Sequence, residues 1–136
     1  MSEKAICHTV TTVSKEMDAL KHRFAMCMKD VSVDYLSGFS LHVCCEYVKL
    51  EAPVLWRLLN ACAQTDRAAD ENKIKNPAMV CTIVAMQLAK ERSNHANHLA
   101  VAFSLFLYAN GAPRRIIEVL SKMGLCTSYI SIMESV

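Results

Sequence analysis

Apolar residues in the C-terminal part of the chain, residues 76–136, recur every three or four positions, which is the spacing of amphipathic helices. Asn76-Pro77 is typical of a helix start, because the Asn side chain accepts hydrogen bonds from free amides and Pro has no amide to leave unpaired. A wide apolar face follows from Met79 to Leu88, and 90–92 is charged. The pattern therefore predicts one helix that ends before Ser93.

The next segment, from Asn97 to Asn110, is apolar on nearly every side. A helix of this kind is buried either at the centre of its own core or against a partner. Crossing a bilayer takes about 20 apolar residues, so the segment is too short to span a membrane. If the helix meets a second copy or another protein, we expect Leu99, Phe103 and Phe106 to make the contact.

Two shorter helices are expected after this one. Asn110-Gly111 is typical of a left-handed helix end, Ala112-Pro113 begins the next helix, and Gly124 turns the chain into a last helix. With Gly124 as the turn glycine, the buried positions of a helix-turn-helix fall on five apolar residues, Val119, Met123, Leu125, Ile130 and Met133. An ordinary αα-hairpin has the same apolar spacing, so both interpretations stay open.

The helix-turn-helix interpretation assigns DNA contacts to polar residues of this final pair. They are Thr127, Ser128 and Ser131 at base edges, with Ile132 on the same face, and Arg114, Arg115 and Lys122 at phosphates. Two features oppose it. Leu120 occupies a position where a small residue usually lets the two helices approach, and the last helix carries Glu134 but no Lys or Arg.

The N-terminal part of the chain predicts a long amphipathic helix within residues 1–30. Its apolar stripe consists of Val10, Val13, Met17, Leu20, Phe24 and Met28. The stripe packs either on the rest of the domain or on a second copy, and Phe24 is a candidate interface residue. A helical turn is expected at 34–37, a helix over Phe39–Lys49 and another from Pro53, whose Trp56 anchors the core or an interface.

The amino-acid composition indicates the fold class that these segments form. Hydrophobic residues make up 53% of the 136 positions, and only three Gly and three Pro are present, so loops are short and helices many. β-branched residues never alternate cleanly with polar ones, which disfavours strands. We therefore expect an all-α, compact bundle of about six to seven helices in one domain, 1–136. Within it, the polar run 64–75 is expected to link an N-terminal half, 1–63, to a C-terminal half, 76–136.

Charge and cysteine content bear on partners and location. The net charge is +2, which is too small by itself to indicate nucleic-acid binding. Seven cysteines, an odd number, are scattered through helical segments, and no apolar signal segment follows Met1–Lys4. We expect free thiols in a reducing compartment, and hence an intracellular protein of the cytoplasm or nucleus.

Residues with catalytic or metal-binding chemistry form no convincing constellation. His42 with Cys45 and His95 with His98 have ligand-like spacing, but structural zinc needs two such pairs together, and no CxxC motif occurs. Three glycines leave no Gly-rich phosphate loop, and no paired carboxylates stand in an apolar setting. We expect no enzyme, no cofactor and no metal site.

Two stretches of this chain resemble a family of uncharacterised proteins of mushroom-forming fungi that are associated with transposable elements. The resemblance spans about 80 residues, and the similar stretches within it are 52–59 and 76–132. Their most specific parts are FLYANGAP at 106–113 and VLSKMGLCTSY at 119–129. The similar segment is an N-terminal helical region of much larger family members. The resemblance implies a nuclear, transposon-derived setting, which modestly favours DNA binding, and transfers no catalytic residue.

Taken together, these patterns predict a non-enzymatic helical interaction module that self-associates or binds a protein partner. The motivation is the large supply of apolar surface for a chain of this length, especially in the helix 97–110 and in the N-terminal stripe. A DNA-binding domain that uses the final helix pair is the alternative.

Overall fold

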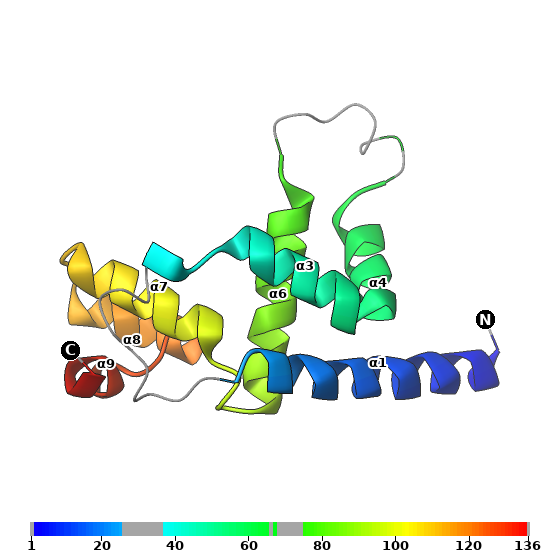
Figure 1. The fold of residues 1–136 in the computed structure, drawn as a ribbon, viewed down its shortest axis with the longest axis horizontal. Helices are drawn as coiled ribbons and strands as arrows, with labels where there is room; N and C mark the ends of the chain where they lie inside the picture. The colour runs from blue at the N-terminus through cyan, green and yellow to red at the C-terminus, as the bar shows by residue number, and fades with distance from the viewer. Residues whose placement is uncertain (1, 26–36, 66, 68–74, 136) are drawn as a thin grey trace.

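The computed structural model describes residues 2–25, 37–65, 67 and 75–135, and in these residues the fold is all-helical (Figure 1). Its helices are α1 (Glu3–Arg23), α3 (Leu41–Glu51), α4 (Pro53–Ala63), α6 (Pro77–Arg92), α7 (His98–Ala109), α8 (Arg114–Lys122) and α9 (Tyr129–Ser135). The predicted fold class, a bundle of six to seven helices ending in a helix pair, is confirmed. Three predicted features lie outside the described residues: Met28, the turn at 34–37 except for its last residue, and most of the run 64–75.

Local signals in the sequence fix the helix ends. The Asn76 side chain accepts a hydrogen bond from the Met79 amide at 3.3 Å, and α6 begins at Pro77 as predicted. Gly111 and Gly124 have φ angles of 73° and 79°, and end α7 and α8 in the left-handed conformation that favours glycine. Ser128 accepts a hydrogen bond from the Ser131 amide at 3.2 Å at the start of α9.

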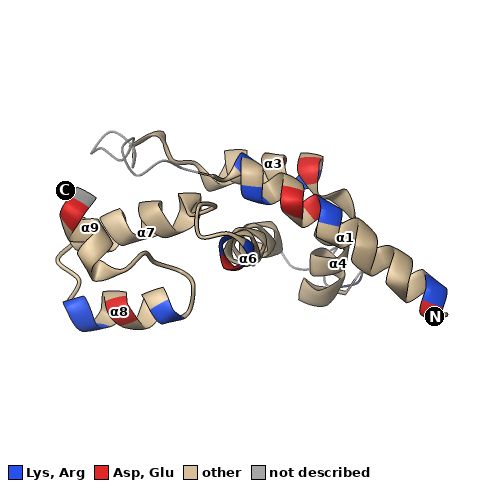
Figure 2. Cartoon of the chain, turned by 90° about the horizontal axis from the view of Figure 1, so that it is seen from below, with Lys and Arg blue, Asp and Glu red and all other residues tan. Residues whose placement is uncertain are grey.

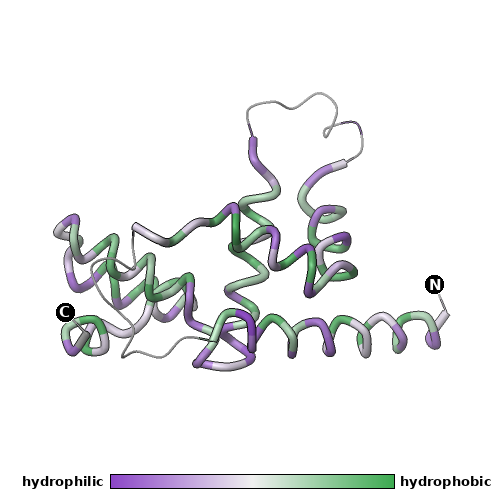
Figure 3. Tube along the Cα trace, in the orientation of Figure 1, coloured by the Kyte–Doolittle hydropathy of each residue, from purple (hydrophilic) through white to green (hydrophobic). Residues whose placement is uncertain are grey.

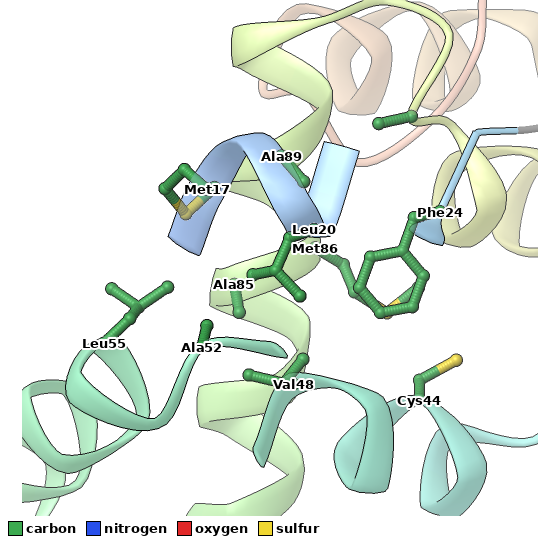
Figure 4. Close-up of a cluster of buried hydrophobic side chains, with 11 residues drawn as sticks. Met17, Leu20, Phe24, Cys44, Val48, Ala52, Leu55, Ala85, Met86 and Ala89 are labelled. Atoms are coloured by element: carbon green, nitrogen blue, oxygen red, sulfur yellow. The ribbon is translucent and has the colours of Figure 1, made fainter. Parts of the chain in front are cut away.

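The main core lies where α6 packs against α1, α3 and α4. Figure 2 shows α6 end-on, with these three helices on one side and α7, α8 and α9 on the other. The buried core consists of Met17, Leu20, Phe24, Cys44, Val48, Ala52, Leu55, Ala85, Met86, Ala89 and Ala96, most of which are labelled in Figure 4. Ala85 and Ala89 are completely buried, and their small side chains let neighbouring helices approach α6 closely. The helix that follows the polar run 64–75 therefore shares its core with the helices that precede it.

Polar contacts hold α1 on this core. The Glu16 carboxylate accepts hydrogen bonds from the amides of Val54 and Leu55 at 3.1 and 2.8 Å. It caps the first turn of α4, whose own N-cap residue, Ala52, makes no side-chain hydrogen bond there. At the end of α6, Arg92 donates to Asp18 at 2.9 Å and to Ser14 at 2.7 Å. The Arg92 guanidinium holds the pKa of the Asp18 carboxyl below its ordinary value of 3.8.

The predicted apolar stripe of α1 is buried only in its C-terminal half. Met17, Leu20 and Phe24 belong to the core, and Val13 packs against its edge. Val10 is 62% exposed. The reason is that α1 runs well past the other helices toward its N-terminus, so that nothing in the described fold covers its first turns (Figure 1).

A smaller cluster holds the last three helices together, but it buries a different face of α8 and α9 from the one that the helix-turn-helix interpretation predicted. Ile117 and Ile132 are completely or almost completely buried, whereas Val119, Met123, Ile130 and Met133 are all about half exposed. Residues two apart on a helix point in nearly opposite directions, because each residue turns the helix by about 100°. With Ile117 and Ile132 turned inward, Val119 and Ile130 must face outward. Four of the five predicted helix-turn-helix core positions were therefore wrong, and only Leu125 is partly buried. Ile132 is not on an exposed recognition face.

The carboxylate cap of α4 gives a stability prediction. We expect Glu16→Ala to lower the free energy of unfolding by about 1–2 kcal/mol, because two amides of the first turn of α4 lose their acceptor. Chemical denaturation monitored by circular dichroism measures the change. The matched control is Glu46→Ala, whose exposed ion pair with Lys49 (3.4 Å) should contribute less than about 0.5 kcal/mol. Equal effects of the two substitutions would contradict the capping role.

Candidate protein-binding groove

An apolar groove of about 480 Å³ opens where α7 meets α6, the start of α3 and the turn after α8. Its lining residues are Phe39, Leu41, Ile83, Leu99, Ala102, Phe103, Phe106 and Leu125. None of them is charged, and three of the four phenylalanines of the chain are among them. A concave surface of this size and character is typical of a site that binds an apolar ligand or side chains of a partner.

The sequence of α7 explains how the groove forms. Most of this helix is hydrophobic along its length (Figure 3), so it has apolar residues to place on two sides at once. Ala100, Val101 and Ser104 are buried on the side that faces the other helices. Leu99, Phe103 and Phe106 follow at four- and three-residue spacing on a second side and line the groove. Helix α7 therefore packs on the other helices with one side and lines an accessible surface with another, and its contact with a partner stays a prediction.

The five predicted interface residues are distributed over different environments. Leu99, Phe103 and Phe106 come together in the groove, and Phe106 is 54% exposed at its rim. Trp56 lies on α4, half-buried against the core, with the Lys49 ammonium 5.6 Å from the centre of its ring. Phe24 is only 2% exposed, so its assignment to an interface does not fit this fold.

Phe24 is buried because aromatic rings surround it. Its ring centroid lies 6.4 Å from that of Tyr47 and 6.3 Å from that of His98, which also contacts Phe39 at 5.0 Å. Burial in this cluster lowers the pKa of His98 below its ordinary value of 6.5. His98 is thus a packing residue beside the groove, and the ligand-like spacing of His95 and His98 has no counterpart in a metal site within the described residues.

The remaining lining residues of the groove were not predicted from the sequence to lie at an interface. Phe39, Leu41, Ile83 and Leu125 lie in three separate segments, and only the packing of α6 and α7 brings them together. Each is apolar in a predicted helical or turn region, which is a pattern shared with most of the chain. No local signal distinguishes them from core residues.

A second apolar surface lies on α8. Ile116, Val119 and Met123 follow one another at three- and four-residue spacing, and each is about half exposed. Scattered exposed apolar side chains are ordinary, but a stripe along one helix face marks a potential contact surface. Leu125, two residues after Met123, already lines the groove, so the two surfaces adjoin in sequence.

The predicted DNA-contact residues are largely engaged with other residues of the fold. The Arg114 guanidinium donates to Glu118 at 2.7 Å and lies 5.0 Å from the centre of the Tyr129 ring. Thr127 donates to Ser104 through its amide at 2.9 Å, and the Ser128 and Ser131 hydroxyls are 2.8 Å apart.

The basic side chains of α8 are separated rather than gathered. Arg114 and Arg115 lie at one end, Lys122 lies at the other, and Glu118 stands between them (Figure 2). Arg114, Lys122 and Ser128 do line one shallow hollow of about 220 Å³, together with Glu118. Glu118 reduces the positive charge that such a hollow could offer to a phosphate.

Thiols and acid–base groups of the described residues do not converge on the groove. Burial raises the pKa of the Cys44 thiol to about 11 and also raises those of Cys81 and Cys126, so these cysteines stay protonated at neutral pH. A separate polar hollow beside α1 contains Arg23 and Glu51, which pair with each other at 2.7 Å. Within the described ranges, no three His, Cys, Asp or Glu side chains lie close enough together to hold a metal ion.

Comparison with known proteins gave no match to a family model, a curated protein or a solved structure. Across the described residues, no helix combines the length and apolarity needed to span a membrane. The class that the fold and the groove define is therefore a helical bundle with an accessible apolar groove, and the resemblance to the fungal transposon-associated family stays an expectation.

Proposed function

We propose that this chain is a non-enzymatic helical interaction module that associates with a second copy of itself, or with a protein partner, through the apolar groove. The observation that carries the proposal is the groove itself, with eight apolar lining residues and an exposed aromatic side chain at its rim. Large aromatic side chains in such settings dominate the binding energy of protein interfaces.

The energetics favour covering the groove. Burying the exposed half of Phe106 alone contributes about 1 kcal/mol, since full burial of a Phe side chain is worth about 1.5–3 kcal/mol. Because no charged residue lines the groove, a partner with apolar side chains pays no cost for leaving a charge unpaired. The groove thus suits apolar anchors of a helix, which is a recurring form of recognition between proteins.

The stripe on α8 supports an interface larger than the groove. Stable interfaces bury about 1,200–2,000 Å² in total, which is more than a single groove supplies. Ile116, Val119 and Met123 offer further apolar surface that begins two residues from a lining residue of the groove. An intracellular location, cytoplasmic or nuclear, is part of the proposal and is supported by the six cysteines of the described residues, all of which are free thiols. A transposon-derived origin rests on the sequence resemblance alone.

Light scattering across a wide range of protein concentration tests the proposal. We expect the average mass of the wild-type chain to rise with concentration, and Phe106→Glu to remain monomeric because it places a charge at the rim of the groove. Leu50→Glu is the matched control: Leu50 is 69% exposed on α3 and does not line the groove, so this variant should associate like the wild type. A wild-type mass that stays that of one chain at every concentration would remove self-association from the proposal.

DNA binding through α8 and α9 is the second candidate, favoured by one observation. Arg114, Lys122 and Ser128 line a common hollow on the surface of this helix pair. If the hollow binds a phosphate of DNA, Lys122→Glu should weaken binding to all duplexes equally and make it less dependent on salt. An electrophoretic shift assay at low salt measures this. Absence of retardation for any duplex would eliminate the candidate.

A further inference from the structure

We propose that the apolar groove of one copy is occupied by the first turns of α1 from a second copy, so that the chain associates head to tail. This inference rests on the proposed function and names the partner. It joins two surfaces that the described fold leaves uncovered, the groove on α7 and the N-terminal part of α1.

The N-terminal part of α1 has the pattern of a helix that packs on something. Ile6 and Val10 are 43% and 62% exposed, and Val13 lies half-buried at the edge of the core. These three residues extend the same three- and four-residue spacing that brings Met17 and Leu20 into the core farther along α1. The stripe thus continues past the end of the bundle, where it has no cover in the described fold (Figure 1).

The threonine hydroxyls of this segment are satisfied within the helix. The hydroxyls of Thr9, Thr11 and Thr12 each donate to the backbone carbonyl four residues earlier, at 2.9 Å. No Asp, Glu, Lys or Arg occurs from Ala5 to Ser14. A helix that remains in water usually relies on charged pairs along its surface. A partner could cover this helix without burying an unpaired Asp, Glu, Lys or Arg charge or an unbonded threonine hydroxyl.

Weak local preference for helix leads to the same conclusion. The run 9–13 consists only of threonine and valine, which are β-branched and among the poorer helix formers. Most of the stability of protein helices comes from packing of the apolar face rather than from such preferences. The first turns of α1 therefore gain from an apolar surface to pack on.

The groove matches this segment in length and in charge. Ile6 and Val10 are four residues apart, as are Leu99 and Phe103 along α7, and at 1.5 Å per residue both spans are about 6 Å. An uncharged helix face would meet an uncharged groove, so that apolar side chains from Ile6 and Val10 replace water against the phenylalanine rings. This complementarity favours a second copy as the occupant.

The shape of the molecule makes the contact intermolecular. The N-terminus of α1 and the groove-lining helix α7 lie at opposite ends of the long axis of the molecule, in both views (Figures 1 and 2). One copy therefore cannot place its own α1 in its own groove. Because the two surfaces differ, one contact leaves one groove and one α1 unused. These either meet each other in a closed two-fold pair or bind further copies in an open chain or ring.

Mixing two variants tests the inference with the full chain. Val10→Glu damages the α1 surface and leaves the groove intact, and Phe106→Glu does the reverse. Each variant alone should be monomeric by sedimentation velocity or light scattering. Their mixture should form dimers and nothing larger, because one intact α1 meets one intact groove and the other two surfaces are both damaged. The wild type, which has both surfaces intact, should associate at lower concentration than the mixture, either as a dimer with two such contacts or as larger species.

Two controls keep the outcome interpretable. Both substituted side chains are more than half exposed, so circular dichroism should show helix content unchanged in each variant. Ile6→Lys provides a second damaged α1 and should complement Phe106→Glu in the same way. Val80→Glu, at a position 58% exposed on α6 and outside the groove lining, should associate like the wild type.

Each other outcome overturns the inference in a recognisable way. If Val10→Glu associates like the wild type while Phe106→Glu does not, the groove binds something other than α1, and the proposed function stands. If Val10→Glu is monomeric and Phe106→Glu is not, α1 pairs with α1 of another copy. A mixture of the two variants that stays monomeric excludes the head-to-tail contact. A wild type that is monomeric throughout contradicts both this inference and self-association.

Discussion

The packing of α6 against α1, α3 and α4 is the contact on which the other features of the molecule depend. Ala85 and Ala89 keep α6 close to its neighbours, and Met86 fills the space beside Leu20 and Phe24 (Figure 4). The same helix contributes Ile83 to the groove. One face of α6 thus fixes the direction in which α1 leaves the bundle, and another face positions the surface against which α7 forms the groove.

The placement of apolar surface follows from this arrangement. Helices that pack around one central helix bury one face each, and the chain has more apolar faces than the arrangement covers. The first turns of α1, the outer face of α8 and the groove side of α7 are among the described regions where exposed apolar surface remains. Polar contacts such as the Glu16 cap and the Arg92 bridge to Asp18 fix α1 in place without covering its N-terminal end. Exposed apolar surface of this kind is consistent with binding to a partner.

Helix positions could be predicted from the sequence because their signals are local. Asn76, Gly111 and Gly124 fix helix ends through hydrogen bonds and backbone angles that involve only a few neighbouring residues. The buried faces of α8 and α9 could not be predicted in the same way, because apolar residues on several sides of a short helix allow more than one orientation. In the folded chain, tertiary packing buries Ile117 and Ile132 and leaves Val119 and Ile130 exposed. Leu99, Phe103 and Phe106 stood out as a group because they share one helix, whereas Phe39, Ile83 and Leu125 meet only in the folded chain.

Amide hydrogen exchange as a function of protein concentration tests the central claim most directly, because it reports on each segment separately. If the groove of one copy binds α1 of another, amides in the first three turns of α1 should become more protected as concentration rises. The residues around the groove on α7 should gain protection over the same concentration range, while α4 stays unchanged. Protection of both segments that is independent of concentration, in a sample where the chain associates, would contradict the account.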